Sequence, residues 1–222
     1  MNIRRKKISN GVNYPNFNEE KKFWKKGLKL VIGIDEAGRG PLAGPVVAGA
    51  VMFKFVKAKH SGVQDSKKLT PKKREEIYNY FKKNPDIEWG IGVVSEKIID
   101  KINILEATKL AMIKAVKDLE KKLVRAETGM QFVLIIDGNM KLNINLVQKS
   151  IIKADQKVFS CALASIFAKV TRDEIMQKFH KKYPEYCFDK HKGYGTNHHF
   201  KMIKKYGYCK IHRKSFYPIK LF

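Results

Sequence analysis

The chain has 222 residues, enough for one domain with a sizeable core, and its 46 Lys and Arg against 21 Asp and Glu give a formal net charge of +25. This basic excess indicates a polyanionic partner, first of all nucleic acid. No apolar run approaches the roughly 18 residues of a membrane-spanning helix, and three cysteines without CxxC spacing favour neither a disulfide framework nor a zinc site. We therefore expect a soluble, cytoplasmic, monomeric protein without a membrane partner.

The first half of the chain predicts two strands and one helix after a basic start. Residues 1–28 are polar and basic and predict an N-terminal arm with a short helix near its end. Residues 30–35 and 46–55 are apolar and separated by Gly and Pro turn signals, so they predict strands. Thr70 before Pro71 is typical of a helix start, and this helix should run to about Phe81.

The second half alternates strands with longer helices. Residues 87–95 alternate as in a strand, and residues 103–123 carry an apolar stripe at helical spacing. Residues 131–137 form an unbroken apolar run, as in a parallel strand buried on both faces. A short strand over 150–155 and a helix over 160–179 follow. Strands interleaved with helices predict one α/β domain with a C-terminal helical extension.

Two apolar runs among the predicted strands end in an acid: Asp35 closes the first strand and Asp137 the fourth. Ligands of open α/β sheets gather at the carboxyl ends of strands, so these acids face each other if the two strands are parallel neighbours. Divalent cations make such a meeting of like charges favourable, and carboxylates without His or Cys select Mg²⁺ or Mn²⁺. Asp155 could reach the same edge. On a basic protein this pattern suggests two-metal phosphodiester hydrolysis; the alternative is solvated strand-end acids, with Asp137-Gly138 a simple turn.

The glycine-rich stretch "GRGPLAGP" (38–45) lacks the G-K-[ST] ending of a phosphate-binding P-loop, so we set nucleotide binding aside. Seven segments, in order along residues 29–217, instead resemble the motifs of bacterial ribonuclease HII. They are "GIDEAGRGPLAGPVVAGAV", "DSKKLTPKKRE", "NILEATKLAM", "IIDGN", "KADQKVFSCALASIFAKVTRDE", "HKGYGT" and "HRKSF". The resemblance implies a ribonuclease H-like catalytic domain over 29–222. Its mixed five-stranded sheet would have adjacent parallel first and fourth strands and flanking helices, and its C-terminal part, from about residue 180, would be helical.

The resemblance also implies the ligands of a metal site. The family's four metal ligands fall on Asp35, Glu36, Asp137 and Asp155, which would hold two Mg²⁺ or Mn²⁺ ions, with Asp35 between them. Asp173 in "TRDE" competes for the fourth place, and we favour Asp155.

Substrate-binding residues follow from the same resemblance. Gly38-Arg39-Gly40 would contact a ribose 2′-hydroxyl through its backbone, and Tyr194 would stack on the next deoxyribose and bond the same hydroxyl. Outside the resemblance, Tyr194 is simply a tyrosine between two glycines. Lys67 and Arg213 are candidate phosphate contacts, and His212 and Ser215, in the same segment as Arg213, are candidate contacts to the DNA strand. The histidines at 191, 198 and 199 suggest a polar loop near nucleic acid rather than a metal site.

The implied activity is metal-dependent hydrolysis of the RNA strand of RNA–DNA hybrids and cleavage 5′ to single ribonucleotides in duplex DNA. A metal-bound water would leave a 3′-hydroxyl and a 5′-phosphate, which would start ribonucleotide removal. An intact Gly-Arg-Gly and a short N-terminal segment favour this family over ribonuclease HIII. One alternative is a non-catalytic basic protein that binds nucleic acid, but such a protein would not place acids where a phosphate must lie. The other is a junction resolvase, whose DNA substrate has no 2′-hydroxyl for Gly38-Arg39-Gly40 and Tyr194 to recognise.

Overall fold

The protein is built on one mixed five-stranded sheet. The computed structural model describes residues 14–54, 63, 66–123 and 132–221, and the strand order is β3-β2-β1-β4-β5. The strands are β1 (Leu30–Ala37), β2 (Val46–Phe53), β3 (Ile87–Val94), β4 (Phe132–Asp137) and β5 (Val147–Ile151). β2 pairs antiparallel with both β1 and β3, whereas β1, β4 and β5 run parallel. The predicted parallel pairing of the first and fourth strands is therefore confirmed.

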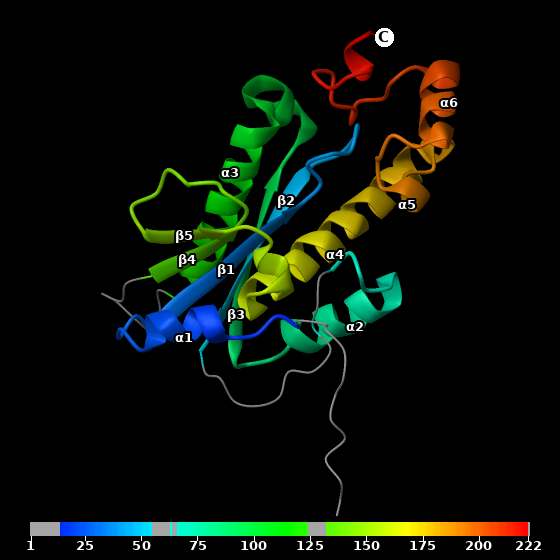
Figure 1. Ribbon diagram of the computed structural model, residues 1–222. Helices are drawn as coiled ribbons and strands as arrows, with labels where there is room; N and C mark the ends of the chain where they lie inside the picture. The colour runs from blue at the N-terminus through cyan, green and yellow to red at the C-terminus, as the bar shows by residue number, and fades with distance from the viewer. Residues whose placement is uncertain (1–13, 55–62, 64–65, 124–131, 222) are drawn as a thin grey trace, which may run out of the picture.

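Helices cover both faces of the sheet (Figure 1). α3 (Glu96–Leu123) packs on one face and α4 (Phe159–Lys182) on the other, where α2 (Pro71–Lys82) lies beside it. One apolar core fills the space under α3, and a second joins the sheet to α2 and α4. Burial of these side chains is the main stabilising term of the fold. Among the described helices, none is long and apolar enough to cross a bilayer.

The C-terminal part forms a small helical layer around the end of α4. It contains α5 (Phe188–His191), α6 (Asn197–Tyr206) and the 3-10 turns Pro184–Tyr186 and Ile219–Leu221. A separate apolar cluster that includes Leu42, Met176, Phe188 and Ile203 joins this layer to α4 and to the loop after β1. The layer therefore lies against the glycine-rich loop, although the two are far apart in the sequence.

The N-terminal segment is more closely attached than an arm outside the domain would be. α1 (Asn18–Trp24) follows Phe17, whose ring lies 4.7 Å from that of Phe159. The Glu20 carboxylate is buried and accepts hydrogen bonds from the backbone and the hydroxyl of Ser160 at the start of α4. Residues 14–28 thus contact the core, while residues 1–13 of the predicted arm lie outside the described residues.

The structure corrects the predicted fifth strand and extends the predicted helix over 103–123. The fifth strand runs over Val147–Ile151 rather than 150–155. It ends at Ile151 because Lys153 adopts a left-handed conformation (φ 57°) and Ala154–Gln156 forms a 3-10 turn. The predicted helix over 103–123 is present, and a further helical segment precedes it, so that α3 as a whole begins at Glu96. Asn103 (φ 65°) interrupts it, and its side-chain oxygen accepts the backbone N–H groups of Leu105 and Glu106. The residues from 104 onward therefore have a helix cap of their own.

Candidate active site at the carboxyl end of β1 and β4

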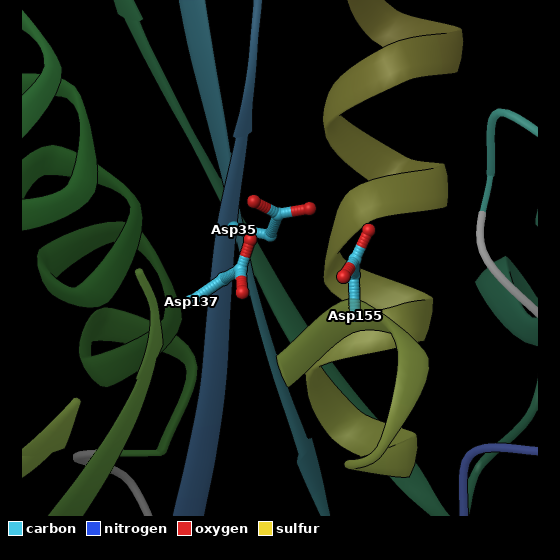
Figure 2. A group of neighbouring side chains, drawn as sticks. All are labelled: Asp35, Asp137 and Asp155. Carbon is cyan, nitrogen blue, oxygen red and sulfur yellow. The ribbon is translucent and has the colours of Figure 1, made fainter. Parts of the chain in front are cut away.

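Three aspartates from separate parts of the chain meet at one edge of the sheet (Figure 2). Ile34 of β1 pairs in parallel with Ile136 of β4, so Asp35 and Asp137 occupy equivalent places on neighbouring strands. Asp155 comes from the 3-10 turn between β5 and α4. One carboxylate oxygen from each residue lies within 4.8 Å of the others. This is the meeting that the sequence predicted for the ends of the two strands.

Hydrogen bonds hold the carboxylates in place. The backbone N–H of Glu36 donates to Asp35 Oδ1 at 2.7 Å, and the N–H of Ala154 donates to Asp137 Oδ1 at 2.5 Å. Asp35 also bonds the Ser165 hydroxyl, which lies 2.8 Å from the Ser66 hydroxyl. The acids are therefore oriented by α4 and by the loop before α2 as well as by the sheet.

The cluster is electrostatically strained without a cation. Burial raises the pKa of Asp35 well above its ordinary value, and the charges of Glu36 and Asp137 raise it further. Burial also raises the pKa of Glu36, against the opposing charges of Arg39 and Lys67. Glu36 Oε2 is buried without a hydrogen-bond partner among the described residues. A cation bound among these acids would offset the repulsion between them.

The donor set fits a hard divalent cation. All three grouped side chains are carboxylates, and oxygen donors suit Mg²⁺ and Mn²⁺, whereas zinc sites favour His and Cys. Glu36 follows Asp35 on β1 and lies near Asp137, whose charge raises its pKa, but it is not one of the three grouped acids. Its Oε1 pairs with Arg39 Nη1 at 3.3 Å.

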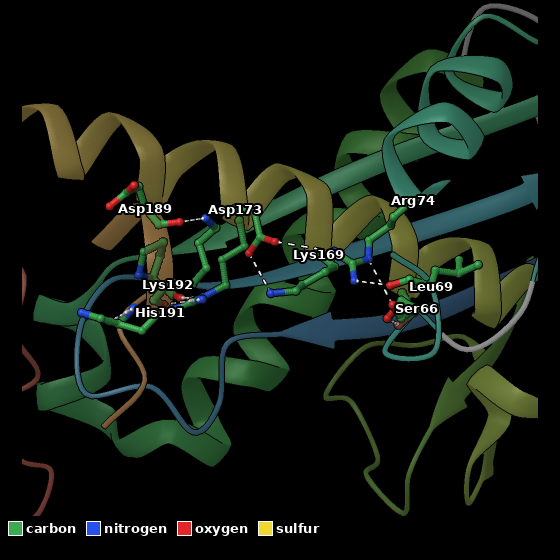
Figure 3. Close-up of polar contacts among 12 residues, drawn as sticks. Ser66, Leu69, Arg74, Lys169, Asp173, Asp189, His191 and Lys192 are labelled. Carbon is green, nitrogen blue, oxygen red and sulfur yellow. Dashed lines mark hydrogen bonds and ion pairs between the residues drawn. The ribbon is translucent and has the colours of Figure 1, made fainter. Parts of the chain in front are cut away.

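Asp173 lies in a different environment from the three acids (Figure 3). It forms ion pairs with Lys169 at 2.8 Å and with Arg74 at 3.7 Å. Arg74 in turn donates to the carbonyl oxygens of Ser66 and Leu69 and so supports the loop before α2. These contacts hold Asp173 on α4, and it is not among the three grouped acids, whereas Asp155 is.

The glycine-rich loop after β1 runs beside these acids and meets Tyr194. Gly38 has φ +98°, and a Cβ there would lie 2.1 Å from Arg172 Nε, so only glycine fits. At Gly40 a Cβ would lie 3.7 Å from the Tyr194 ring, which is 46% exposed. The Leu42 N–H donates to the Gly193 carbonyl at 2.8 Å and joins the two loops. Exposed backbone at Gly40 thus lies beside an exposed aromatic ring, and Arg39 of the same loop pairs with Glu36.

The comparisons with known proteins agree with this geometry. Residues 32–218 match the family model of ribonuclease HII. The chain belongs to this family. The ribonuclease HII of Chlamydia trachomatis serovar A is 49% identical over 195 residues, which cover 88% of this chain and 85% of that protein. Family membership makes the chain a divalent-metal-dependent ribonuclease H, an endonuclease that hydrolyses RNA in RNA–DNA hybrids.

Solved structures show the same fold. The ribonuclease H2 of Pyrococcus horikoshii OT3 superposes with a TM-score of 0.66 at 28% identity, over 86% of this chain and 96% of the other. Bst-RNase HIII in complex with Mn²⁺ superposes with a TM-score of 0.62 at 19% identity, over 87% of this chain and 68% of the other. The predicted ribonuclease H-like fold, with its helical C-terminal part, is confirmed.

The structure corrects the prediction that Arg213 of this ribonuclease contacts a phosphate. Its side chain is fully buried, and its guanidinium donates to the carbonyl oxygens of Gly38, Arg39, Gly44 and Pro45. A group enclosed in this way cannot touch a phosphate, so the prediction of a direct contact was wrong. The segment that contains Arg213 is part of the interior because the C-terminal layer packs over the glycine-rich loop.

The other predicted basic and histidine residues divide between surface and interior. Lys67 is exposed and close enough to Glu36 to lower the pKa of that acid. His198 is exposed, whereas His199 and His212 are buried with their Nε2 atoms 3.0 Å apart. The expectation of a polar loop at the nucleic acid therefore fails for His199, and that of a DNA-strand contact fails for His212.

Sequence reasoning missed the residues that support the site from behind. Ser165, Ser66 and Arg172 were not singled out. Ser165 bonds Asp35, Ser66 bonds Ser165, and Arg172 donates to carbonyl oxygens of the glycine-rich loop. Ser165 is a small polar residue within the apolar run "CALASIFA", and Arg172 is a basic residue on the buried side of α4. Such polar interruptions in buried helices were the available signal, because a buried polar group needs a partner.

Proposed function

We propose that this ribonuclease cuts duplex DNA 5′ to a single embedded ribonucleotide as well as the RNA strand of hybrids, and leaves a 3′-hydroxyl and a 5′-phosphate. The observation that carries the proposal is that Gly40 meets the Tyr194 ring in the same loop whose Arg39 pairs with Glu36, the neighbour of Asp35 in the acid cluster. The 2′-hydroxyl alone separates RNA from DNA at one nucleotide. A site that recognises the 2′-hydroxyl next to the reacting phosphate can act on a single ribonucleotide and does not require a longer stretch of RNA. Its cellular role would be to start the removal of ribonucleotides from DNA.

The acids in this proposal hold the cofactor. Asp35, Glu36, Asp137 and Asp155 would bind two divalent ions, Mg²⁺ or Mn²⁺. The crowding of these carboxylates and the unpaired Glu36 Oε2 support this assignment. When bound, such ions supply a Lewis acid for the phosphate and a water of lowered pKa. The protein contributes oriented oxygens, fixed by the amides of Glu36 and Ala154 and by Ser165.

The substrate groups would be held by residues on the same surface. Gly38, Arg39 and Gly40 would approach the ribose with their backbone, and Tyr194 would stack on the following sugar. Lys67 would contact a phosphate, which its exposure and its closeness to Glu36 support. We also propose that the enzyme acts as a monomer in the cytoplasm, where its three free cysteines would remain reduced.

The test is cleavage of a labelled DNA duplex that contains one ribonucleotide. We expect one metal-dependent cut 5′ to the ribonucleotide and a product strand that can be extended by a polymerase because it ends in a 3′-hydroxyl. Asp35→Asn and Asp155→Asn should each lower the cleavage rate by about a hundredfold or more. Asp173→Asn is the matched control and should change the rate only a few-fold.

Three results would count against this proposal. Cleavage of long hybrids without any cut at the single ribonucleotide would restrict the enzyme to hybrids. Equal losses in Asp155→Asn and Asp173→Asn would remove the assignment of Asp155. A titration with Mn²⁺ that saturates at one ion per protein in the presence of substrate would contradict the proposed second metal ion.

A further inference from the structure

Arg213 is a buried cation with an unusual set of partners. It is fully buried, and no carboxylate of the described residues lies within ion-pair distance of it. Burial lowers its pKa to about 9. Burying a charge without a counter-charge costs several kcal/mol unless its donors are satisfied. Here backbone carbonyl oxygens satisfy them, so the guanidinium is tied to the shape of one loop.

Two of these carbonyl oxygens belong to consecutive peptides of the glycine-rich loop. Arg213 Nη2 donates to the Gly38 oxygen at 2.6 Å, and Nη1 donates to the Arg39 oxygen at 2.9 Å. In a trans peptide the C=O and the N–H of one plane point in opposite directions. Arg213 therefore turns the Gly38–Arg39 and Arg39–Gly40 peptides so that the N–H groups of Arg39 and Gly40 point away from the interior.

These two N–H groups are free to bind something outside the chain. Arg39 and Gly40 are exposed, and their amides have no acceptor among the described residues. Gly40 has no side chain to shield its amide, and the Tyr194 ring lies beside it. The loop has little freedom to turn over, because Gly38 is pressed against Arg172, which donates to the carbonyl oxygens of Ala43 and Pro45. Adjacent amides that point outward are a ready site for an oxygen ligand.

We propose that Arg213 is a positioning residue for ribonucleotide recognition: it holds the amides of Arg39 and Gly40 outward so that they donate to the oxygens of the ribose. The inference rests on the proposed function, in which this loop reads the sugar. The inference adds Arg213 as the residue that sets the direction of the Arg39 and Gly40 N–H groups. Arg213 itself touches no substrate and acts only through the two peptide planes.

The first experiment compares two affinities in metal-free buffer, where no cleavage occurs. The dissociation constant of an all-DNA duplex is divided by that of the same duplex with one ribonucleotide. Arg213→Lys keeps the positive charge but loses the planar fork that holds two carbonyls at once. We expect this ratio to fall by about tenfold in Arg213→Lys, as expected for a lost hydrogen bond to the sugar.

Arg74→Lys is the matched control. Arg74 is also buried and donates to two carbonyl oxygens, those of Ser66 and Leu69, but in a loop that would contact phosphate. Arg74→Lys should weaken the binding of both duplexes equally and leave the ratio of their dissociation constants as in the wild type. An unchanged ratio in Arg213→Lys, or an equal fall in both variants, would overturn the inference. A wild-type ratio near one would instead contradict the proposed reading of the ribose, so the two failures are distinguishable.

A second measurement needs no variant and so does not depend on whether Arg213→Lys folds. Amide hydrogen exchange of Arg39 and Gly40, followed by NMR, should be fast in the free protein because the amides have no acceptor. Binding of the ribonucleotide duplex should slow the exchange of both amides by about tenfold, and the all-DNA duplex should not. Slow exchange in the free protein, or equal protection by both duplexes, would contradict the inference.

Discussion

Asp35 combines burial, a neighbouring acid on the next strand and hydrogen bonds that fix its direction. Its exposed fraction is 5%, and it receives the Glu36 amide and the Ser165 hydroxyl. A side chain placed for stability alone would not be ionised in such surroundings, because burial and like charges both favour its neutral form. The residue is held at a cost to the fold, as is common at functional sites.

This cost leads to the first prediction, that Asp35→Asn stabilises the metal-free protein. A raised pKa means that the folded state binds the proton more tightly than the unfolded state, so ionisation at neutral pH lowers the free energy of unfolding. The amide has no charge to bury, and we expect a gain of about 1–2 kcal/mol in EDTA at pH 7. Thermal unfolding followed by circular dichroism measures it.

The same variant should lose its response to metal. Mg²⁺ should raise the unfolding midpoint of the wild type by binding the folded state, and should raise that of Asp35→Asn much less. A variant less stable than the wild type in EDTA would show that the carboxylates are not in repulsive contact.

At the level of the elements, close contact between α3 and β3 depends on glycine. A Cβ at Gly92 would lie 1.9 Å from the Ala111 carbonyl oxygen and 2.6 Å from the Ala115 amide nitrogen. These are backbone atoms of a packed helix and cannot move aside independently. The helix therefore approaches the strand more closely than any side chain at this position allows.

Gly92→Ala should accordingly destabilise the protein by about 3 kcal/mol, at the upper end of the usual cost of overpacking. Val93→Ala is the matched control on the same strand. Val93 is 40% exposed, and its change should cost less than about 1 kcal/mol. Urea unfolding of both variants measures the difference, and similar midpoints would refute the close approach.

A buried histidine pair joins α6 to the segment before Arg213 and depends on both rings being neutral. The Cys209 N–H donates to His212 Nδ1 at 2.9 Å, which leaves His212 Nε2 to donate to His199 Nε2 at 3.0 Å. His199 Nδ1 then donates to the Tyr194 carbonyl oxygen at 2.9 Å. Burial lowers the pKa of His199 to about 3 and that of His212 to about 4. A proton on either ring would break this chain of donors.

The stability of the protein should therefore fall on acidification. Both pKa values are lower in the folded state than the ordinary 6.5, so the contribution of the pair is present above pH 6.5 and is lost as the pH falls toward 4. For His212 the loss should be on the order of 2–3 kcal/mol by pH 4. His212→Gln should flatten this part of the pH profile of the unfolding free energy, and His198→Gln, at an exposed position, should leave it unchanged. Equal slopes in the wild type and His212→Gln would contradict the assignment.

At the scale of the whole molecule, the net charge of +25 should govern affinity for duplexes. Each phosphate neutralised by a lysine or arginine releases a counterion, so affinity falls steeply with salt. With six or more phosphate contacts, we expect a loss of about a thousandfold between 50 and 200 mM salt. Fluorescence anisotropy at several salt concentrations measures the slope.

The all-DNA duplex should show the same slope as the ribonucleotide duplex, because sugar recognition releases no counterions. A much shallower slope for either duplex would mean that few of the basic side chains contact the backbone.

Most elements could be predicted from local pattern, because each is specified by residues close in sequence. Apolar periodicity located β1, β2, β3, β4 and the core of α3 and α4, and Thr70-Pro71 marked the start of α2. The boundary of β5 could not be predicted, because it depends on the left-handed turn at Lys153 and on pairing with β4. Strand pairing depends on two segments together, so it cannot be predicted from the sequence of either segment alone.

The candidate site divides in the same way. Asp35 and Asp137 could be proposed as partners from their places at the ends of apolar strands, whereas the choice of Asp155 over Asp173 came from a family resemblance and is supported by the geometry. The roles of Ser165, Arg172 and Arg213 emerged only in three dimensions. Composition and strand pattern specify which groups are present and which end of a strand they occupy. Whether a buried arginine faces a phosphate or the back of a loop depends on which distant segment covers it, and that is decided only when the C-terminal layer packs against the loop after β1.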